Sequence, residues 1–318
     1  MTKIFSGIVP VMLTPFTSDN KIDWDGLEHL TEWYIQYGVD TLFAVCQSSE
    51  MQALSLAERA ELATRTVKLA AGRVPVIASG HISDNKEDQR EELRTMAGTG
   101  INGLILVTNH LDPKNAGEET FRTGLNDALG WLPSELPLGL YECPAPYRRL
   151  LSDDEFKLCR DSGRFNVLKD VSCNLDILRR RVEMSGDSGF AVVNANAAIA
   201  AEAMRAGSLG FAGVFNNFHP DLYKWLYENC NLDSNLRRRL ETFLALSGMA
   251  EPMGYPKLAK LFHKNLGTFA SEHTRVIDFD IEERYWAAGA LLDHITAGTE
   301  SFRSEIAAFE RERAVGSS

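Results

Sequence analysis

Short apolar runs recur along this chain, mostly at intervals of about thirty residues. They are continuously apolar rather than alternating, as expected of parallel strands that are buried on both faces. Stretches with helical periodicity separate them, so the pattern predicts an alternation of strands and helices. The eight runs cover residues 7–13, 41–45, 74–79, 103–107, 136–141, 166–169, 189–193 and 211–215.

The segments between the runs carry signals for the start of helices. Ser55 with Glu58, and Ser152 with Glu155, have the spacing of a capping box. Eight strands alternating with helices favour a (β/α)8 TIM barrel. A doubly wound open sheet is the alternative, but it would carry a glycine-rich fingerprint after its first strand. The residues there, Leu13-Thr14-Pro15-Phe16, bear no similarity to one.

About a hundred residues follow the eighth run, and their pattern is helical. Helices are predicted around residues 222–228, 236–246, 255–265 and 282–297, with residues 315–318 disordered. The barrel needs one of these helices. We therefore expect a barrel over residues 1–225 and a C-terminal helical extension over residues 226–318 that packs on it, as a single structural unit.

The charge balance excludes one class of function. Acidic residues outnumber basic ones by 44 to 33, which gives a formal net charge of -11 and opposes binding to nucleic acid. Basic triplets occur at residues 179–181 and 237–239, both within helical patterns, and we interpret them as solvated helix faces.

The cysteines and the apolar runs indicate the setting of the protein. The five cysteines show no CxxC spacing, so neither a disulfide framework nor a zinc site is indicated, and reduced thiols fit a cytoplasmic protein. The N-terminus lacks a signal-peptide layout, and no run approaches the ~20 apolar residues of a membrane helix. We expect no membrane partner, no metal and no cofactor.

One tyrosine and one lysine stand at the ends of neighbouring runs, Tyr141 after the fifth and Lys169 after the sixth. Barrel active sites form at these strand ends. A lysine amine in a partly apolar pocket has a lowered pKa and can attack a carbonyl carbon. The plain alternatives are a lysine that extends to solvent and a tyrosine that caps a strand, but adjacent strand ends favour a catalytic pair.

Other polar residues follow the strand ends. Gln47, Ser48 and Ser49 lie in a turn after the second run, where hydroxyls and amides could hold a small carboxylate or could simply cap the turn. Glu50 is expected to anchor that turn. His110, after the fourth run, is a candidate for a substrate contact.

Five segments match the motifs of one family in order and spacing. Residues 7–16 match its opening, residues 46–50 its G-T/S-T-G-E turn, and residues 207–213 its G-x-x-G-x-x-S/G strand. Tyr141 and Pro144 match its Y-x-x-P motif, and Leu168-Lys169-Asp170 its lysine motif. Over roughly residues 5–300 the chain resembles the dihydrodipicolinate synthase/N-acetylneuraminate lyase superfamily of Schiff-base class I aldolases.

The resemblance implies a (β/α)8 barrel with a C-terminal helical extension, usually assembled as a homotetramer. It also implies a lyase that acts on pyruvate or another 2-keto acid by aldol chemistry or dehydration. Lys169 would form the imine, and Tyr141 would carry protons. Ser48 with neighbouring amides would hold the carboxylate, and the carbonyl of Ala212 would line the imine pocket.

The chain departs from the family at several positions. Gln47 replaces the first Thr or Ser of the turn motif, and Ser49 replaces a glycine. Leu111 stands where the synthase has the tyrosine that completes its proton relay across a dimer interface. Pro146 stands where the synthase has the arginine that holds its aldehyde substrate, with Arg148 and Arg149 nearby. The imine half of the machinery matches and the second-substrate half does not.

Leu111 suggests how the chains assemble. An apolar side chain in that loop has little reason to face water, and its burial would contribute ~1.5–3 kcal/mol. We hypothesise that Leu111 packs across a two-fold interface of a homodimer or homotetramer.

Three hypotheses of function follow. The first is a Schiff-base lyase, and the second is a barrel that binds a small carboxylate without turnover. The third is a phosphate-binding isomerase or decarboxylase, which would carry a glycine-rich loop after strand seven or eight. Residues 194–196 and 216–217 do not supply one.

Overall fold

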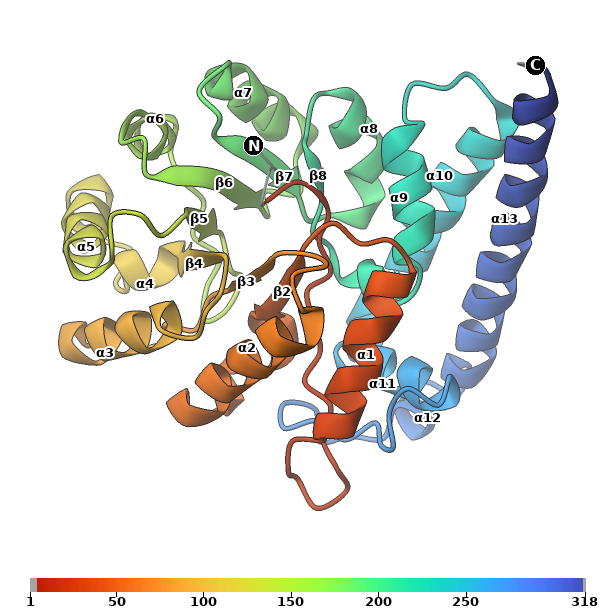
Figure 1. The fold of residues 1–318 in the computed structure, drawn as a ribbon, viewed down its shortest axis with the longest axis horizontal. Coiled ribbons are helices and arrows are strands. Elements are labelled where there is room, and N and C mark those ends of the chain that lie inside the picture. The colour runs from red at the N-terminus through yellow and green to blue at the C-terminus, as the bar shows by residue number, and fades with distance from the viewer. Residues whose placement is uncertain (1–4, 317–318) are drawn as a thin grey trace.

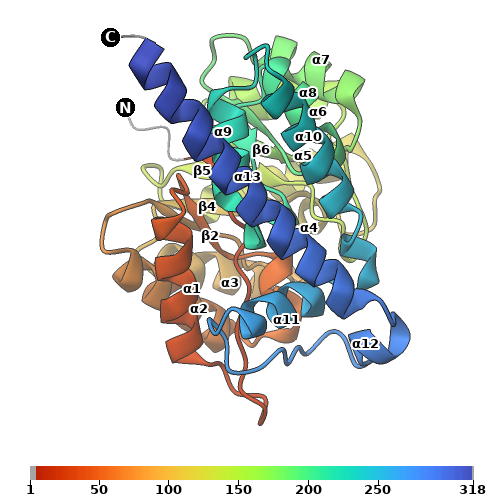
Figure 2. The same cartoon turned by 90° about the vertical axis from the view of Figure 1, so that its right-hand side faces the viewer.

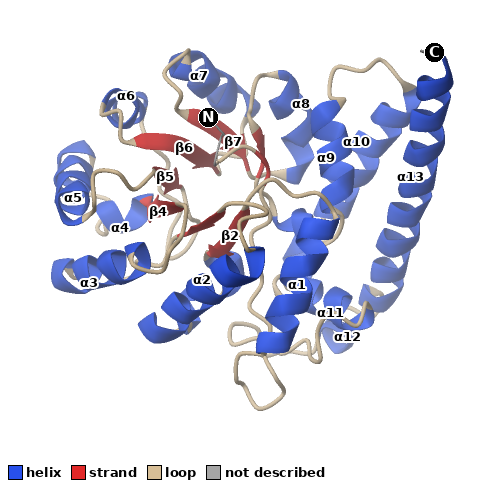
Figure 3. Cartoon of the chain, viewed as in Figure 1, coloured by secondary structure: helices blue, strands red, loops and turns tan. Residues whose placement is uncertain are grey.

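The computed structural model describes residues 5–316 and contains an eight-stranded parallel sheet. The strand order is β1-β8-β7-β6-β5-β4-β3-β2, so each strand from β2 to β7 pairs with the next one along the chain, and β1 pairs with β8. The strands lie at the centre of a ring of helices (Figure 1, Figure 3). They are β1 Gly7–Ile8, β2 Leu42–Val45, β3 Val76–Ala78, β4 Gly103–Val107, β5 Leu138–Tyr141, β6 Phe165–Asp170, β7 Ala191–Asn194 and β8 Gly210–Phe211.

The contact between the first two strands closes the sheet into a barrel. Val11 forms a parallel bridge with Phe43, and the Met12 N–H donates to the Phe43 carbonyl at 3.0 Å. The Asp40 N–H donates to the Ile8 carbonyl at 2.9 Å. This closure confirms the (β/α)8 TIM barrel and makes the doubly wound open sheet wrong.

Several strands are shorter than predicted, the first and the last among them. The run over residues 7–13 is a regular strand only at Gly7–Ile8, because Pro10 has no N–H to continue the ladder. The run over residues 211–215 contributes Phe211 to β8, and a 3-10 turn over Val214–Asn217 follows. Both differences lie where the chain leaves the sheet for the mouth of the barrel.

A glycine is required where β8 meets β1. Gly210 pairs with Gly7 and has a φ of +149°. A Cβ at Gly210 would lie only 2.0 Å from the Gly7 carbonyl oxygen, so any other residue would push the two strands apart. The motif over residues 207–213 therefore has a structural reason at this position.

A helix follows every strand and covers the outside of the barrel. Both predicted capping boxes are present, with the Ser55 and Ser152 hydroxyls accepting from the N–H groups of Glu58 and Glu155 at 3.2 and 3.1 Å. The helices are α1 Trp24–Gln36, α2 Leu56–Ala70, α3 Lys86–Ala97, α5 Glu118–Trp131, α6 Asp153–Asp161, α7 Leu175–Ser185, α8 Ala200–Arg205 and α9 Pro220–Glu228, with a short α4 Thr108–Leu111 after β4.

The C-terminal residues form a helical extension beside the barrel, in α10 Asn235–Gly248, α11 Lys257–Asn265, α12 Ile281–Arg284 and α13 Ala288–Gly316. Helix α13 runs across the side of the molecule next to α9 and α10 (Figure 2). The Trp225 indole N–H donates to Glu310 at 2.8 Å, and Arg303 bonds Asp221 at 2.7 Å.

The end of the chain differs from expectation. The helix predicted over residues 282–297 is divided into α12 and α13, and α13 continues to Gly316. The prediction of disorder from residue 315 is wrong for residues 315 and 316, and the rest of it lies outside the described residues. The division into a barrel and an extension stays a prediction, and α9 continues through residue 225 to Glu228. Within residues 5–316, no helix has the length and apolar character needed to cross a membrane.

Candidate active site

The predicted lysine and tyrosine lie side by side at the C-terminal ends of β5 and β6. Tyr141 pairs with Lys169 in the parallel register, and the Lys169 Nζ lies 4.1 Å from the centroid of the Tyr141 ring. Lys169 is 8% exposed and Tyr141 is 4% exposed. Two buried side chains on adjacent strands cannot drift apart without disrupting the sheet, so the pair is held in place.

Burial changes the protonation of both groups. It lowers the pKa of the Lys169 ammonium, while the nearby Cys46, Cys143 and Glu251 act in the opposite direction. It raises the pKa of the Tyr141 hydroxyl well above its usual value. The lysine therefore reaches its neutral, nucleophilic form more readily than an exposed lysine, and the tyrosine keeps its proton at neutral pH.

Two thiols lie around the pair. Burial raises the pKa of both Cys46 and Cys143, so both stay protonated at neutral pH. The Cys143 Sγ donates to the Gln47 Oε1 at 3.3 Å, and the Tyr141 hydroxyl also interacts with Cys143. Among residues 5–316, no three His, Cys, Asp or Glu side chains are grouped so that they could hold a metal ion.

The two serines of the turn after β2 have different contacts. The Ser49 hydroxyl lies 2.7 Å from the Met12 carbonyl and 2.9 Å from the Ala44 carbonyl, and it accepts from the Cys46 N–H at 3.2 Å. Ser49 thus ties the turn to the barrel wall. Ser48 is also buried, but its hydroxyl interacts with Tyr255, which comes from the C-terminal extension.

Glu50 anchors the same turn, as predicted. It has a positive φ of +60°, and its buried carboxylate accepts from the Thr274 hydroxyl at 2.8 Å and from the Arg275 N–H at 2.6 Å. The buried Lys260 ammonium bonds its other oxygen. The turn that carries Ser48 is therefore attached to the extension by an internal ion pair.

Sequence reasoning missed two residues of the mouth, both in the segment between α10 and α11. The Tyr255 hydroxyl accepts from the Asn217 amide at 3.0 Å and lies beside Ser48. Glu251 is exposed at the rim, yet the protein around its carboxyl group raises its pKa, an effect that Lys169 partly opposes. Neither residue lies near a strand end, so no pattern in the sequence marked them.

The remaining predicted site residues are placed as follows. Ala212 lines the same small internal cavity as Lys169. The His110 Nδ1 lies 3.2 Å from the Asp84 carboxylate, and its ring meets that of His81 edge-on at 5.7 Å. Burial lowers the pKa of His110. These contacts direct His110 towards the loop after β3, and its predicted substrate contact stays a prediction.

Leu111 does not do what the sequence suggested. It is 1% exposed within its own chain, at the end of α4, where its backbone packs closely against Gly124 of α5. A side chain already buried inside the monomer cannot pack across a two-fold interface. The proposed interfacial role of Leu111 is therefore wrong.

The arginines near Pro146 also have structural partners. Arg149 is buried between Asp112 at 3.0 Å and Glu155 at 2.6 Å. Arg148 is exposed and donates to the Val171 carbonyl at 3.2 Å. Arg149 is fully engaged, so Arg148 is the guanidinium nearer to solvent in this loop.

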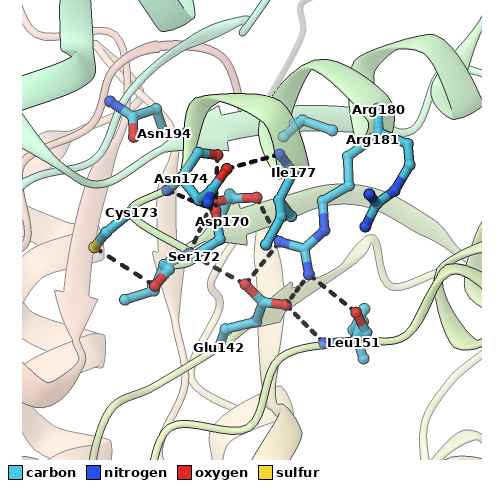
Figure 4. A network of polar contacts seen from close by, with 12 residues as sticks. Glu142, Leu151, Asp170, Ser172, Cys173, Asn174, Ile177, Arg180, Arg181 and Asn194 are labelled. Atoms are coloured by element: carbon cyan, nitrogen blue, oxygen red, sulfur yellow. Dashed lines mark hydrogen bonds and ion pairs between the residues drawn. The ribbon is translucent and has the colours of Figure 1, made fainter.

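The first basic triplet is only partly a solvated face. Arg179 and Arg180 are exposed, as expected, but Arg181 is 1% exposed and points between Glu142 and Asp170 (Figure 4). The interpretation of residue 181 as solvated is wrong, because α7 turns that side chain towards the barrel. In the second triplet, Arg238 and Arg239 are exposed and pair with surface carboxylates.

A large open pocket lies at the other end of the barrel. It has a volume of about 1070 Å³, and its walls include Phe5, Val74, Pro137 and Gly189, which precede their strands. Barrel enzymes carry their chemistry at the opposite, C-terminal ends of the strands. Position and residue types both favour the Lys169 end as the active site.

A closed parallel barrel with a buried lysine–tyrosine pair at its C-terminal mouth places the protein among the (β/α)8-barrel enzymes. Residues 4–245 match the model of the dihydrodipicolinate synthetase family, and the chain belongs to that family. Family membership makes it an aldolase-type lyase or synthase, as the motifs of the sequence implied.

Individual relatives have low sequence identity to this chain, but the matches cover most of its length. The chain is 25% identical over 299 residues to the 4-hydroxy-tetrahydrodipicolinate synthase of a Shewanella species, covering 92% of this chain and 98% of that one. It is 28% identical over 233 residues to the enzyme of the same name from Rickettsia felis, covering 73% and 76%.

Solved structures agree on the fold. Dihydrodipicolinate synthase from Thermotoga maritima superposes with a TM-score of 0.81 at 19% identity, covering 93% of this chain and 99% of that one. A monomeric dihydrodipicolinate synthase variant gives 0.83 at 19% identity, covering 94% and 98%. At this identity the likeness establishes the barrel and its extension, not the reaction.

Proposed function

We propose that the protein is a Schiff-base lyase that acts on pyruvate or another 2-keto acid through an imine at Lys169. The observation that carries the proposal is the buried Lys169 amine, with its lowered pKa, 4.1 Å from the ring of Tyr141. Desolvation favours the neutral amine, which is the form that attacks a carbonyl. Membership of the family supports the same chemistry.

The pair supplies the groups that the first steps need. The neutral Lys169 amine adds to the keto carbon, and the resulting carbinolamine loses its hydroxyl group as water to give the iminium. Tyr141 donates the proton that the departing hydroxyl takes up, which leaves a tyrosinate beside the iminium, and it recovers a proton from the carbon next to the iminium carbon. Loss of that proton gives the enamine, from which aldol chemistry or dehydration can proceed.

The turn after β2 and the extension would hold the substrate carboxylate. Ser48 offers a hydroxyl and its backbone amide, and the Tyr255 hydroxyl lies next to it. Because Tyr255 accepts from Asn217, its own proton is free to be donated. Two hydroxyls and turn amides together match the several donors that a carboxylate requires. The Ala212 carbonyl would line the imine side of the same pocket.

The second-substrate half of the site differs from that of a synthase that binds a charged aldehyde. Pro146 offers no cation, Arg149 is engaged by two carboxylates, and the acidic Glu251 stands at the rim. We infer that the distal part of the substrate is not a carboxylate, because an acidic rim repels one.

Assembly into a homodimer or homotetramer, as the family resemblance implies, stays a prediction. Leu111 cannot mediate it, so other surfaces must. Light scattering at micromolar concentration would give the mass of two or four chains.

The direct test is to trap the imine. Pyruvate followed by borohydride should add one keto-acid adduct per chain, read by intact mass and localised by peptide mapping to Lys169. The Lys169→Ala variant should give none. Retention of the adduct in that variant, or its absence from the parent protein, would overturn the proposal.

One observation favours the second candidate, a barrel that binds a carboxylate without turnover. The Tyr141 hydroxyl has the Cys143 thiol as a polar neighbour, which burial keeps protonated, and Leu111 brings no proton carrier. The two candidates separate cleanly. A trapped adduct with no cleavage, condensation or dehydration across a panel of 2-keto acids would select the binding protein, and turnover would select the lyase.

A further inference from the structure

Arg181 lies directly behind the proposed catalytic pair. It is on α7, the helix that follows β6, and its guanidinium reaches Glu142 and Asp170 (Figure 4). Glu142 is the residue after Tyr141, and Asp170 is the residue after Lys169. Successive residues of a strand point to opposite faces. Tyr141 and Lys169 therefore face the barrel mouth, while their neighbours face the helix layer.

The guanidinium joins the two strand ends. Its Nη1 lies 2.9 Å from one Glu142 oxygen, its Nη2 lies 2.5 Å from the other, and Nη1 also bonds Asp170. Nη2 further donates to the Leu151 carbonyl at 3.1 Å. The side chains of all three charged residues are at most 2% exposed. The fork with Glu142 has the two-bond geometry that only arginine provides.

Backbone groups complete the cluster and cross-link the loops. Glu142 at the end of β5 accepts from the Val171 N–H, just after β6, at 3.2 Å, and from the Leu151 N–H at 2.8 Å. Asp170 accepts from the Ser172 N–H at 2.9 Å and from its hydroxyl at 2.6 Å. The ends of β5 and β6 are thus fastened to each other on the outer face of the barrel.

The charges make the arrangement depend on Arg181. Two buried carboxylates share one guanidinium, and burial raises the pKa of Glu142 even with the cation present. Without Arg181, two like charges would face each other out of water, or one would take up a proton. Either change acts on the residues next to Tyr141 and Lys169.

We propose that Arg181 is a positioning residue, which holds the ends of β5 and β6 at the separation that places the Lys169 amine over the Tyr141 ring. It acts through Glu142 and Asp170 and does not touch the substrate. The proposal rests on the imine function proposed above. It goes beyond that function, because it assigns the geometry of the pair to a residue on the far side of the barrel wall.

The molecule contains a matched control. Arg59 and Glu92 form another buried pair at 2.8 Å, with side chains 3% and 6% exposed. This pair joins α2 to α3, and neither residue adjoins Tyr141 or Lys169 in the chain. Arg59→Met and Arg181→Met each leave a buried carboxylate without its cation, so both should lower the thermal unfolding midpoint.

The experiment compares imine formation in the two variants at a temperature where both are folded by circular dichroism. At saturating pyruvate, the single-turnover rate of borohydride-trapped adduct should fall ~10–100-fold in Arg181→Met, because a small misplacement of the amine slows its attack. The pyruvate concentration at half-saturation should change less than about threefold. Arg59→Met should trap at the rate of the parent protein. Arg181→Lys, which restores the charge without the fork, should trap at an intermediate rate.

The trapping rates of these variants distinguish a positioning role of Arg181 from a purely structural one. If Arg181→Met traps as fast as Arg59→Met, Arg181 contributes only to stability and the proposal falls. If Arg181→Met does not fold, Arg181→Lys provides the comparison, and a parent-like rate there overturns the proposal equally. If the parent protein forms no adduct at all, the proposed function fails instead, and the two failures cannot be confused.

Discussion

At the scale of single residues, the proposed function depends on the protonation of the Lys169 amine. Lys169 is buried with an aromatic ring and two thiols around it, and desolvation outweighs the groups that would keep it charged. Tyr141, on the neighbouring strand, is buried as a neutral phenol. The pKa values of the proposed nucleophile and of the proposed proton carrier are thereby shifted in opposite directions by the same cause, which is removal from water.

The lowered pKa of Lys169 predicts how imine formation depends on pH. The initial rate of adduct trapping should rise with pH and reach half its maximum below pH 10.5, the value for an exposed lysine. A half-maximum at or above pH 10.5 would contradict the burial argument. Rapid-quench trapping from pH 6 to 11 measures it.

The same shift has a consequence for stability. Between the lowered pKa and 10.5, the unfolded chain binds more protons at Lys169 than the folded chain, so the free energy of unfolding rises with pH in that window. Lys169→Met lacks this contribution. The parent protein should gain stability relative to Lys169→Met as pH rises towards 10.5, as urea unfolding of both proteins at each pH would show.

At the scale of elements, the site is built by two parts of the chain that are far apart in sequence. The barrel supplies Lys169, Tyr141 and the turn with Ser48, and the segment leading into α11 supplies Tyr255. Asn217, after β8, holds the Tyr255 hydroxyl, and the ion pair of Glu50 with Lys260 docks α11 on the turn. Loss of that docking would change the site without touching the imine.

Tyr255→Phe tests the contribution of the extension to substrate binding. Removing a hydroxyl that bonds a carboxylate should weaken pyruvate binding ~10–100-fold, as a rise in the concentration needed for half-maximal trapping. The maximal trapping rate should change little. Tyr227→Phe, on α9, is the control and should leave both values unchanged. A fall in the maximal rate alone would mean that Tyr255 moves protons instead of holding the carboxylate.

The buried ion pair of Glu50 and Lys260 predicts how substitutions there change the free energy of unfolding. Burial lowers the pKa of Lys260 to about 8 even beside Glu50, so desolvation is costly there. Lys260→Met should destabilise the protein by ~3–5 kcal/mol, because it leaves Glu50 buried and uncompensated. Adding Glu50→Gln should recover most of that loss, since the amide oxygen can still accept from Thr274 and Arg275.

A surface pair provides the control for these measurements. Lys264 and Glu272 form an ion pair with side chains 44% and 33% exposed, and Lys264→Met should cost less than about 1 kcal/mol. Denaturant unfolding gives the free energy of unfolding of the parent protein, the two single variants and the double variant. Equal losses in Lys260→Met and in the double variant would show that the charge balance of Glu50 is unimportant.

At the scale of the whole molecule, membership of the family does not by itself determine which reaction the protein catalyses. The chain shares its fold with dihydrodipicolinate synthases over more than nine-tenths of its length, at about one-fifth identity. Tyr141 and Lys169 agree with the family motifs, whereas Gln47 and Ser49 depart from them and the rim carries Glu251 and Pro146. Evolution of a barrel enzyme commonly keeps the core chemistry and varies the loops that select the second substrate.

We therefore expect the protein to be a poor dihydrodipicolinate synthase. Condensation of pyruvate with aspartate semialdehyde should proceed at a kcat/KM well below ~10⁴ M⁻¹s⁻¹, the lower end for efficient enzymes. A coupled assay with a reductase for the product would measure it, with an authentic synthase as the positive control. An efficient reaction would mean that the exposed Arg148 reaches the substrate, and Arg148→Ala should then abolish it.

Much of this protein was determined by the sequence alone. Short continuous apolar runs at regular intervals, separated by helical patterns, are typical of strands buried on both faces, so they predicted the barrel and its helices. The placement of Tyr141 and Lys169 at adjacent strand ends follows from the same pattern, because parallel neighbours end at one face. The capping boxes were equally predictable, since each depends on residues close in sequence. The anchoring role of Glu50 was predicted too, but its partners Lys260, Thr274 and Arg275 lie more than two hundred residues away.

Only the tertiary structure decided which side chains are buried by distant partners. Arg181 and Arg180 are indistinguishable in a basic triplet, but one turns inward to two carboxylates and the other faces water. Leu111 is covered by its own chain and needs no partner subunit, and Tyr255 reaches Ser48 from about two hundred residues away. The local sequence pattern predicts whether a side chain can be buried. Which side chain it then contacts depends on the residues that the closed barrel brings next to it.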